Sequence, residues 1–234
     1  MYSDSVELII SELKNNNVLK EFSKDEIKIL NNEIIEVTYH KGQEIIHEGC
    51  KPTGIYGILK GTAKLYQNGF NGKEQILRFV KRGDIIGYRS LLCGESFSAS
   101  CTSIDDELVA IYIPEIIFNK LLKVSSKVSF DILKKISLDL GEAGKTITLL
   151  AQKTVRERLA EVLLFLEKKL GVDQEGFINI TLTREEMANL IGTATESAIR
   201  LISEFKGDKL IKVSGRKIKI LDHKMLTRLG HVTL

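Results

Sequence analysis

Ten of the 18 glycines lie between Gly42 and Gly94, with short strand-like runs between them. The runs have five to eight residues and are rich in Ile, Val, Tyr and Phe, as in EVTYH, GIYGIL, EQILRFV and DIIGY. Closely spaced turn residues between short apolar runs favour antiparallel strands. The spacing predicts a β-sandwich or barrel, which continues through SASCTSID and ELVAIYI to Pro114. We expect helices beside it over residues 5–15 and 24–31 and in EIIFNKLLK.

The apolar period changes after residue 125. Residues 125–153 contain no Pro, and apolar side chains recur at spacings of three and four. Such a stripe is the seam of a coiled coil, and a helix of this length extends about 40 Å. We expect a homodimer through this helix, with packing against the chain's own β domain as the alternative. Two glycines inside it, Gly141 and Gly144, predict close approach to a partner helix or a ligand. The predicted seam residues are Leu133, Ile136, Leu140, Ala143, Ile147 and Leu150.

Excess positive charge is confined to the C-terminal third. Residues 1–153 hold 20 basic and 20 acidic side chains, whereas residues 200–234 hold nine basic and three acidic ones. A basic end on a neutral body is typical of a module that contacts a polyanion, although a solvated basic face is also common.

The same third has the pattern of a winged helix-turn-helix. Thr183 opens a helix with a capping box to Glu186, Gly192 breaks that helix, and a second helix runs from near Thr193 to Gly207. An amphipathic helix, TVRERLAEVLLFLEKKL, and a short strand pair, FINITL, precede them. The final run, KLIKVSGRKIKIL, predicts a hairpin that would form the wing.

The second helix is the candidate recognition helix. Its outward face carries Glu196 and Arg200, one turn apart, with Thr195 beside them. Arg can bond guanine in a bidentate fashion and Glu can accept from the cytosine amino group, so we expect these three residues to contact bases. A Thr193–Glu196 capping box or a Glu196–Arg200 surface pair is the alternative. The expected inward face is Ile191, Ile199, Ile202 and Phe205. The expected DNA backbone contacts are Thr183, Arg184, Thr193, Ser197, Arg216 and Lys217.

This order of segments resembles the cAMP receptor protein/FNR (Crp/Fnr) family of bacterial transcription regulators, from about residue 10 to 222. The most specific stretch is TREEMANLIGTATESAIRLISEFKGDKLIKVSGRKIKI, with Thr-Arg-x-Glu, a Gly turn, Glu before an aliphatic-Arg pair, and a Gly-Arg/Lys wing. By that resemblance Glu196 and Arg200 read bases, while Thr195 stands where the family often has Arg. The glycines at the family's turns are Gly42, Gly49, Gly61, Gly72, Gly83 and Gly87.

The resemblance implies an α+β fold. Residues 1–124 would form a double-stranded β-helix (a β-roll resembling cyclic nucleotide-binding domains), 125–153 a dimerisation helix, and 154–234 the winged helix-turn-helix. It also implies a homodimer that binds a palindromic operator in double-stranded DNA and works with RNA polymerase.

The residues that bind cAMP in such relatives are missing. Gly87-Tyr88 stands in place of Gly-Glu, and Phe97-Ser98 in place of the Arg-Ser that binds the cyclic phosphate. A buried phosphate without its cation is costly, so we expect an effector other than cAMP, or none, with the pocket filled by Tyr88 or Phe97. Arg89 is a candidate substitute cation or a surface group. The candidate pocket is Gly87, Tyr88, Arg89, Phe97, Ser98, Ala143 and Gly144.

Other classes are disfavoured. Cys50, Cys93 and Cys101 are too few and too scattered for a disulfide framework or an iron–sulfur cluster, so we expect packed free thiols, with a Cys93–Cys101 redox pair as the alternative. Only His40 and His47 lie in the β region, which disfavours haem and a cupin-like metal enzyme. We expect no metal, cofactor or catalysis. The chain has no signal peptide or membrane span, so we expect a cytoplasmic protein.

Overall fold

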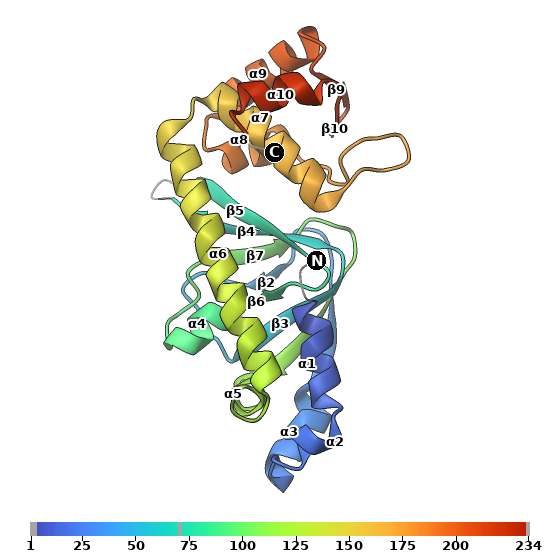
Figure 1. Ribbon diagram of the computed structural model, residues 1–234, viewed down its shortest axis with the longest axis vertical. Helices are drawn as coiled ribbons and strands as arrows, with labels where there is room; N and C mark the ends of the chain where they lie inside the picture. The colour runs from blue at the N-terminus through green and yellow to red at the C-terminus, as the bar shows by residue number, and fades with distance from the viewer. Residues whose placement is uncertain (1–3, 70–71, 233–234) are drawn as a thin grey trace. The chain divides into compact units, whose positions relative to one another are not determined.

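Two antiparallel four-stranded sheets form the first half of the chain in the computed structural model, which describes residues 4–69 and 72–232 (Figure 1). The strand orders are β1-β8-β3-β6 and β2-β7-β4-β5, so the predicted β-roll is confirmed. The strands are β1 Ile35–Tyr39, β2 Glu44–Ile46, β3 Gly54–Lys60, β4 Thr62–Asn68, β5 Glu74–Lys81, β6 Ile85–Ile86, β7 Ser100–Ser103 and β8 Leu108–Pro114.

An apolar core fills the roll. Alternate strand residues point inward, and Ile58, Val80, Cys101 and Leu108 have no accessible surface. Burial of such side chains is the main stabilising contribution, about 25 cal/mol per Å² of apolar surface. Phe97 belongs to the same core, which matters for the candidate effector pocket.

Helices pack outside the roll and form a second core with β3 and β8. They are α1 Ser5–Leu13, α2 Asn16–Leu19, α3 Lys24–Glu33, α4 Tyr88–Cys93, α5 Glu115–Val124 and the beginning of α6 Ser126–Gln152. The helix predicted over residues 5–15 is confirmed as α1, which ends at Leu13, and the short helix α2 follows from Asn16. Val128 and Ile132 anchor α6 in this core together with Phe118 of α5.

The prediction of a strand over DIIGY is wrong at its last two residues, because β6 ends at Ile86. The chain leaves β6 after Ile86, because Gly87 adopts a φ of 86° that favours glycine, and Tyr88 begins α4. A Cβ at Gly87 would also lie 3.1 Å from the Phe97 ring.

The chain divides into two units, Met1–Gly69 with Ile76–Glu142, and Phe70–Gln75 with Ala143–Leu234. The predicted long helix is the 27-residue α6, which contributes to both. The second unit also contains α7 Val155–Leu170, α8 Arg184–Ile191, α9 Thr195–Gly207, β9 Ile211–Ser214, β10 Lys217–Ile220 and α10 His223–Leu229.

Two details of the second unit differ from the sequence prediction. The expected FINITL strand pair is a single bridge between Val172 and Ile178, because the surrounding residues form turns. Helix α10 was not predicted, and it packs on α7.

Candidate DNA-binding surface

Helix α8 begins at a complete capping box. The Thr183 hydroxyl accepts from the Glu186 N–H at 3.0 Å, and the Thr183 N–H donates to the Glu186 carboxylate at 2.8 Å. Gly192 ends the helix with a φ of 63°, which turns the chain toward α9. The first helix and the turn therefore form as the sequence predicted.

The guanidinium of Arg158 in α7 is hydrogen-bonded to the turn between α8 and α9. Its Nη1 donates to the carbonyl oxygens of Ile191 at 2.7 Å and Gly192 at 3.1 Å. These are carbonyls that a helix end leaves unpaired, and a cation is favourable there. The Arg158 Nε is buried and has no hydrogen-bond partner among the described residues. Sequence reasoning missed this residue, because its partners lie 33 and 34 residues further along the chain.

Glu196 and Arg200 on helix α9 are exposed and are not paired with each other. The helix begins at Thr195 after Ala194, with no side-chain cap, so the alternative Thr193–Glu196 capping box does not form. Glu196 is exposed and has no hydrogen bond or ion pair to any residue that the structure describes. The Arg200 side chain is 75% exposed, and its Nε lies 3.9 Å from Glu204 rather than pairing with Glu196.

One residue of the predicted inward face is misplaced. Ile191, Ile202 and Phe205 are buried, but Ile199 is 45% exposed. Ala198 takes the inward position instead, because it lies four residues before Ile202 on the face that packs against the domain core. Ile199 therefore lies on the outward face of α9.

Side-chain contacts join the wing hairpin to the start of α8 and to the loop that contains Asp173. The Arg184 guanidinium donates to the Gly215 carbonyl at 3.0 Å, which links the start of α8 to the hairpin turn. The Lys217 ammonium lies 2.9 Å from the Asp173 carboxylate. Their hydrogen bond and mutual attraction raise the pKa of Lys217 and lower that of Asp173. Lys217 already has an anionic partner, whereas Arg216 on the same hairpin is exposed.

The remaining expected backbone contacts, Thr193 and Ser197, are both half-buried at the start of α9. A DNA backbone that approaches this end of the helix would meet them beside Thr195, which is also half-buried.

Comparison with known proteins identifies the architecture. Residues 36–125 match the model of the cyclic nucleotide-binding domain, and residues 157–229 match that of the Crp-like helix-turn-helix domain. The fumarate and nitrate reduction regulatory protein of Vibrio cholerae is 30% identical over 197 residues, which cover 82% of this chain and 77% of the relative. The chain belongs to the Crp/Fnr family. It is a DNA-binding transcription regulator, as the sequence predicted.

Other relatives of this Crp/Fnr regulator agree. Electron transport regulator A of Shewanella oneidensis is 30% identical over 194 residues, with 81% of this chain and 76% of the relative covered. FixK2 from Bradyrhizobium japonicum shares the fold with a TM-score of 0.76 and 22% identity, over 86% of this chain and 99% of the FixK2 chain.

The predicted seam of the Crp/Fnr regulator faces solvent in the single chain. Leu133, Leu140 and Ile147 are 59%, 73% and 67% exposed, and Ile136 is 38% exposed. Ala143 is exposed and Leu150 half-buried. Leu133, Ile136 and Leu140 belong to the same unit as the roll and are exposed there, so the alternative of packing on the chain's own β domain is not supported for these three.

The candidate effector pocket separates into buried and exposed residues. Tyr88 and Phe97 are buried, and Phe97 packs on Gly87. Arg89 instead points to solvent and pairs with Glu95 at 3.1 Å, so it is not a buried cation. Ser98 is exposed as well, as are Ala143 and Gly144, which belong to the second unit. Among the described residues, no atom lies within 4 Å of a Cβ built at Gly141 or Gly144, so the close approach to a partner helix or a ligand stays a prediction.

A partly buried polar network occupies the region around Tyr88. The Tyr88 hydroxyl donates to Asp139 of α6 at 2.5 Å, and Asp139 also lies 3.2 Å from Lys135 and 3.5 Å from Arg78. Burial would raise the pKa of Asp139, but Arg78, the Tyr88 hydroxyl and Lys135 together hold it below its ordinary value. Burial, followed by the hydrogen bond to Asp139, raises the pKa of Tyr88. Sequence reasoning could not find this link, because 51 residues separate Tyr88 and Asp139.

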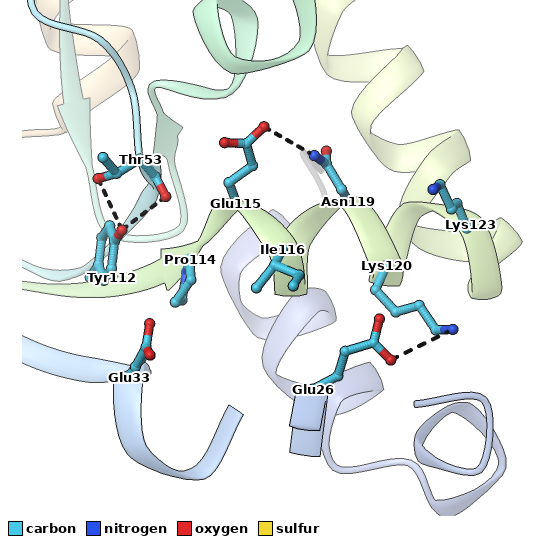
Figure 2. A pocket seen from close by; sticks show the side chains of 10 residues that line it. All are labelled: Glu26, Glu33, Thr53, Tyr112, Pro114, Glu115, Ile116, Asn119, Lys120 and Lys123. Atoms are coloured by element: carbon cyan, nitrogen blue, oxygen red, sulfur yellow. Dashed lines mark hydrogen bonds and ion pairs between the residues drawn. The ribbon is translucent and has the colours of Figure 1, made fainter. Parts of the chain in front are cut away.

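A hollow of about 620 Å³ lies elsewhere, outside the roll (Figure 2). Figure 2 shows charges of both signs around it, and the Glu26–Lys120 pair is 3.8 Å apart. Its wall also includes Tyr112, whose hydroxyl donates to Thr53. It shares no residue with the candidate effector pocket. The lining residues are Glu26, Glu33, Thr53, Tyr112, Pro114, Glu115, Ile116, Asn119, Lys120 and Lys123.

The cysteines and the other side chains that can bind metals form no further candidate site among the described residues. Cys50 and Cys93 are exposed and Cys101 is buried, which raises the pKa of Cys101 to about 12. A thiol with that pKa is almost fully protonated and a poor partner for a Cys93–Cys101 redox pair. Within residues 4–69 and 72–232, no group of three or more His, Cys, Asp or Glu side chains could hold a metal ion. In the same part of the chain, no helix is long and apolar enough to cross a membrane.

Proposed function

We propose that the protein is a homodimer that reads a palindromic operator with α9 of each protomer. The observation that carries this proposal is the free outward face of α9, where Glu196 has no partner in the described chain and Arg200 has only a distant one. A recognition helix places such side chains against base edges in the major groove.

The proposed base readers have complementary chemistry. Arg200 donates two hydrogen bonds to O6 and N7 of a guanine, and Glu196 accepts from the amino group of a cytosine. Thr195, at the first turn of α9, adds a hydroxyl contact. Thr183, Arg184, Thr193, Ser197, Arg216 and Lys217 contact phosphates and fix the register of the helix on the duplex.

Dimerisation follows from the exposed stripe on α6. Burial of Leu133, Leu140 and Ile147 against a second copy removes apolar surface from water, which is the main driving force for association. Two-fold symmetry then places two recognition helices on half-sites about 34 Å apart, one turn of DNA. Bound at a promoter, the dimer contacts RNA polymerase.

Regulation does not use cAMP in this proposal. Phe97, which by the family resemblance stands in place of the phosphate-binding Arg, packs in the apolar core of the roll, and Tyr88 is hydrogen-bonded to Asp139. The cations nearest to Tyr88, Arg78 and Lys135, are already paired with Asp139, so a cyclic phosphate would have to displace that carboxylate to gain a cation. The buried aromatic side chains favour a regulator that binds DNA without an effector in the roll. An effector of other chemistry remains the second candidate, at a site that includes Gly87, Arg89 and Ser98.

The test is selection of genomic DNA fragments by the purified dimer, alone, with cAMP, and with a metabolite extract. Enrichment of one palindrome by the protein alone, unchanged by cAMP, supports the effector-independent form. Enrichment only with the extract supports the second candidate, a regulator that needs an effector other than cAMP. Enrichment that requires cAMP contradicts the account of the roll, and absence of any enriched sequence in all three arms contradicts the proposed function.

A further inference from the structure

Ile199 is an aliphatic side chain at one side of the outward face of α9 that carries Glu196 and Arg200. It is 45% exposed, follows Glu196 by three residues and directly precedes Arg200. A single exposed aliphatic residue is ordinary on a protein surface and needs no explanation by itself. Its place on the same helix face as two candidate base readers gives it significance.

The helix geometry places all three side chains on one face. At about 100° per residue, Ile199 projects roughly 60° to one side of Glu196, and Arg200 about 40° to the other. The three therefore share an arc of about 100° around the helix axis. Ile199 cannot turn into the domain core, because Ala198, Leu201 and Ile202 occupy that face. A duplex that contacts both Glu196 and Arg200 therefore lies against the face that carries Ile199.

The chemistry of the major groove restricts what Ile199 can contact favourably. Base edges in this groove present donors and acceptors, and the C5 methyl of thymine is the apolar exception. An aliphatic side chain pressed against a polar edge removes its hydrating water without replacing the hydrogen bonds, which is unfavourable. Contact with a methyl group instead buries apolar surface on both sides.

We infer that Ile199 is a specificity-determining residue, which selects a thymine by contact with its C5 methyl at a base pair beside those read by Glu196 and Arg200. The inference rests on the proposed function and deepens it, since it predicts a base of the operator. Thymine is preferred through attraction, and the other bases are disfavoured through their unpaired polar edges.

The test removes the methyl groups one at a time. Each thymine of the selected palindrome is replaced symmetrically by deoxyuridine, which keeps the base-pairing edge and lacks only the methyl. Loss of one buried methyl corresponds to about a fourfold change in affinity per half-site. We expect the wild type to show this loss at one thymine position, measured by fluorescence anisotropy, and the Ile199→Ala and Ile199→Ser variants to be nearly insensitive at that position.

The control variant is Met225→Ala. Met225 is 42% exposed on α10, a helix that packs on α7, so its removal changes exposed apolar surface away from α9. It should keep the wild-type deoxyuridine profile. Either of two results overturns the inference: a palindrome without thymine in its half-sites, or a deoxyuridine profile shared by the wild type and both Ile199 variants. Failure to select any palindrome would instead reject the proposed function, so the two failures are distinguishable.

Discussion

Arg158 sets the geometry of the helix-turn-helix, and its replacement by Met tests that role. Methionine keeps the length and apolar character of the stem but removes the guanidinium. The two hydrogen bonds from Nη1 to the carbonyls of Ile191 and Gly192 are lost, at 2.7 and 3.1 Å. The turn between α8 and α9 then loses the group that joins it to α7.

The expected cost follows from the two hydrogen bonds that are lost and the one unpaired buried nitrogen that is removed. A hydrogen bond to a charged group contributes about 1.5–3 kcal/mol, so two of them contribute about 3–6 kcal/mol. The buried and unpaired Nε of Arg158 offsets part of this, about 1–3 kcal/mol, and Met removes that penalty. The net destabilisation is therefore about 3 kcal/mol.

Two assays check this prediction. Urea denaturation should show the loss of about 3 kcal/mol, whereas Arg228→Met, an exposed position on α10, should stay within about 0.5 kcal/mol of wild type. Under conditions where the variant is folded, affinity for the operator should fall more than affinity for nonspecific DNA, because α9 is no longer held in place. The reasoning is refuted if Arg158→Met matches Arg228→Met in stability and keeps the wild-type ratio of specific to nonspecific binding.

Three further predictions concern the wing, the long helix and the roll. Asp173→Asn should strengthen DNA binding, because it releases Lys217 from its ion pair. Lys217→Ala should weaken binding to all sequences and flatten the slope of log affinity against log salt concentration by about one. An unchanged slope would show that the wing does not contact the DNA backbone. Leu140→Asp should place a charge in the apolar seam and yield a monomer by light scattering, and a variant that stays dimeric contradicts the seam. The folded pKa of Asp139 is lowered, so its contribution to stability is full above the unfolded pKa of about 3.9 and is lost as the pH falls through the lower folded value. Urea denaturation should thus show wild type more stable than Asp139→Asn at pH 7 but not near pH 2, and equal stability at pH 7 would contradict the network around Tyr88.

Features encoded within a few residues could be predicted from the sequence. The Thr183–Glu186 capping box depends on two side chains and two N–H groups within four residues, so its pattern was sufficient. The periodic stripe on α6 likewise predicted a long helix. The inward face of α9 was predicted less well, because the small Ala198 gave a weaker apolar signal than Ile199 beside it.

Features that join distant segments could not be predicted. Arg158 reaches carbonyls more than 30 residues away, and Tyr88 reaches Asp139 on another helix. Neither contact leaves a periodic pattern in the sequence. The same limit applies to Asp173, whose pairing with Lys217 depends on how an irregular loop packs against the wing. Sequence alone therefore predicted the recognition helix but not the contacts that hold it.

The most direct test of the central claim compares the DNA sequences selected by the wild type and by Arg200→Ala from a random duplex library. The account predicts a palindrome with half-site centres about 34 Å apart for the wild type, and loss of preference at one symmetric base pair, at a cost of about 1–3 kcal/mol, for the variant. Arg89→Ala, which removes an exposed Arg of the roll, should select the wild-type palindrome. The account is contradicted if Arg200→Ala weakens binding to every sequence equally, because Arg200 would then contact phosphate rather than a base.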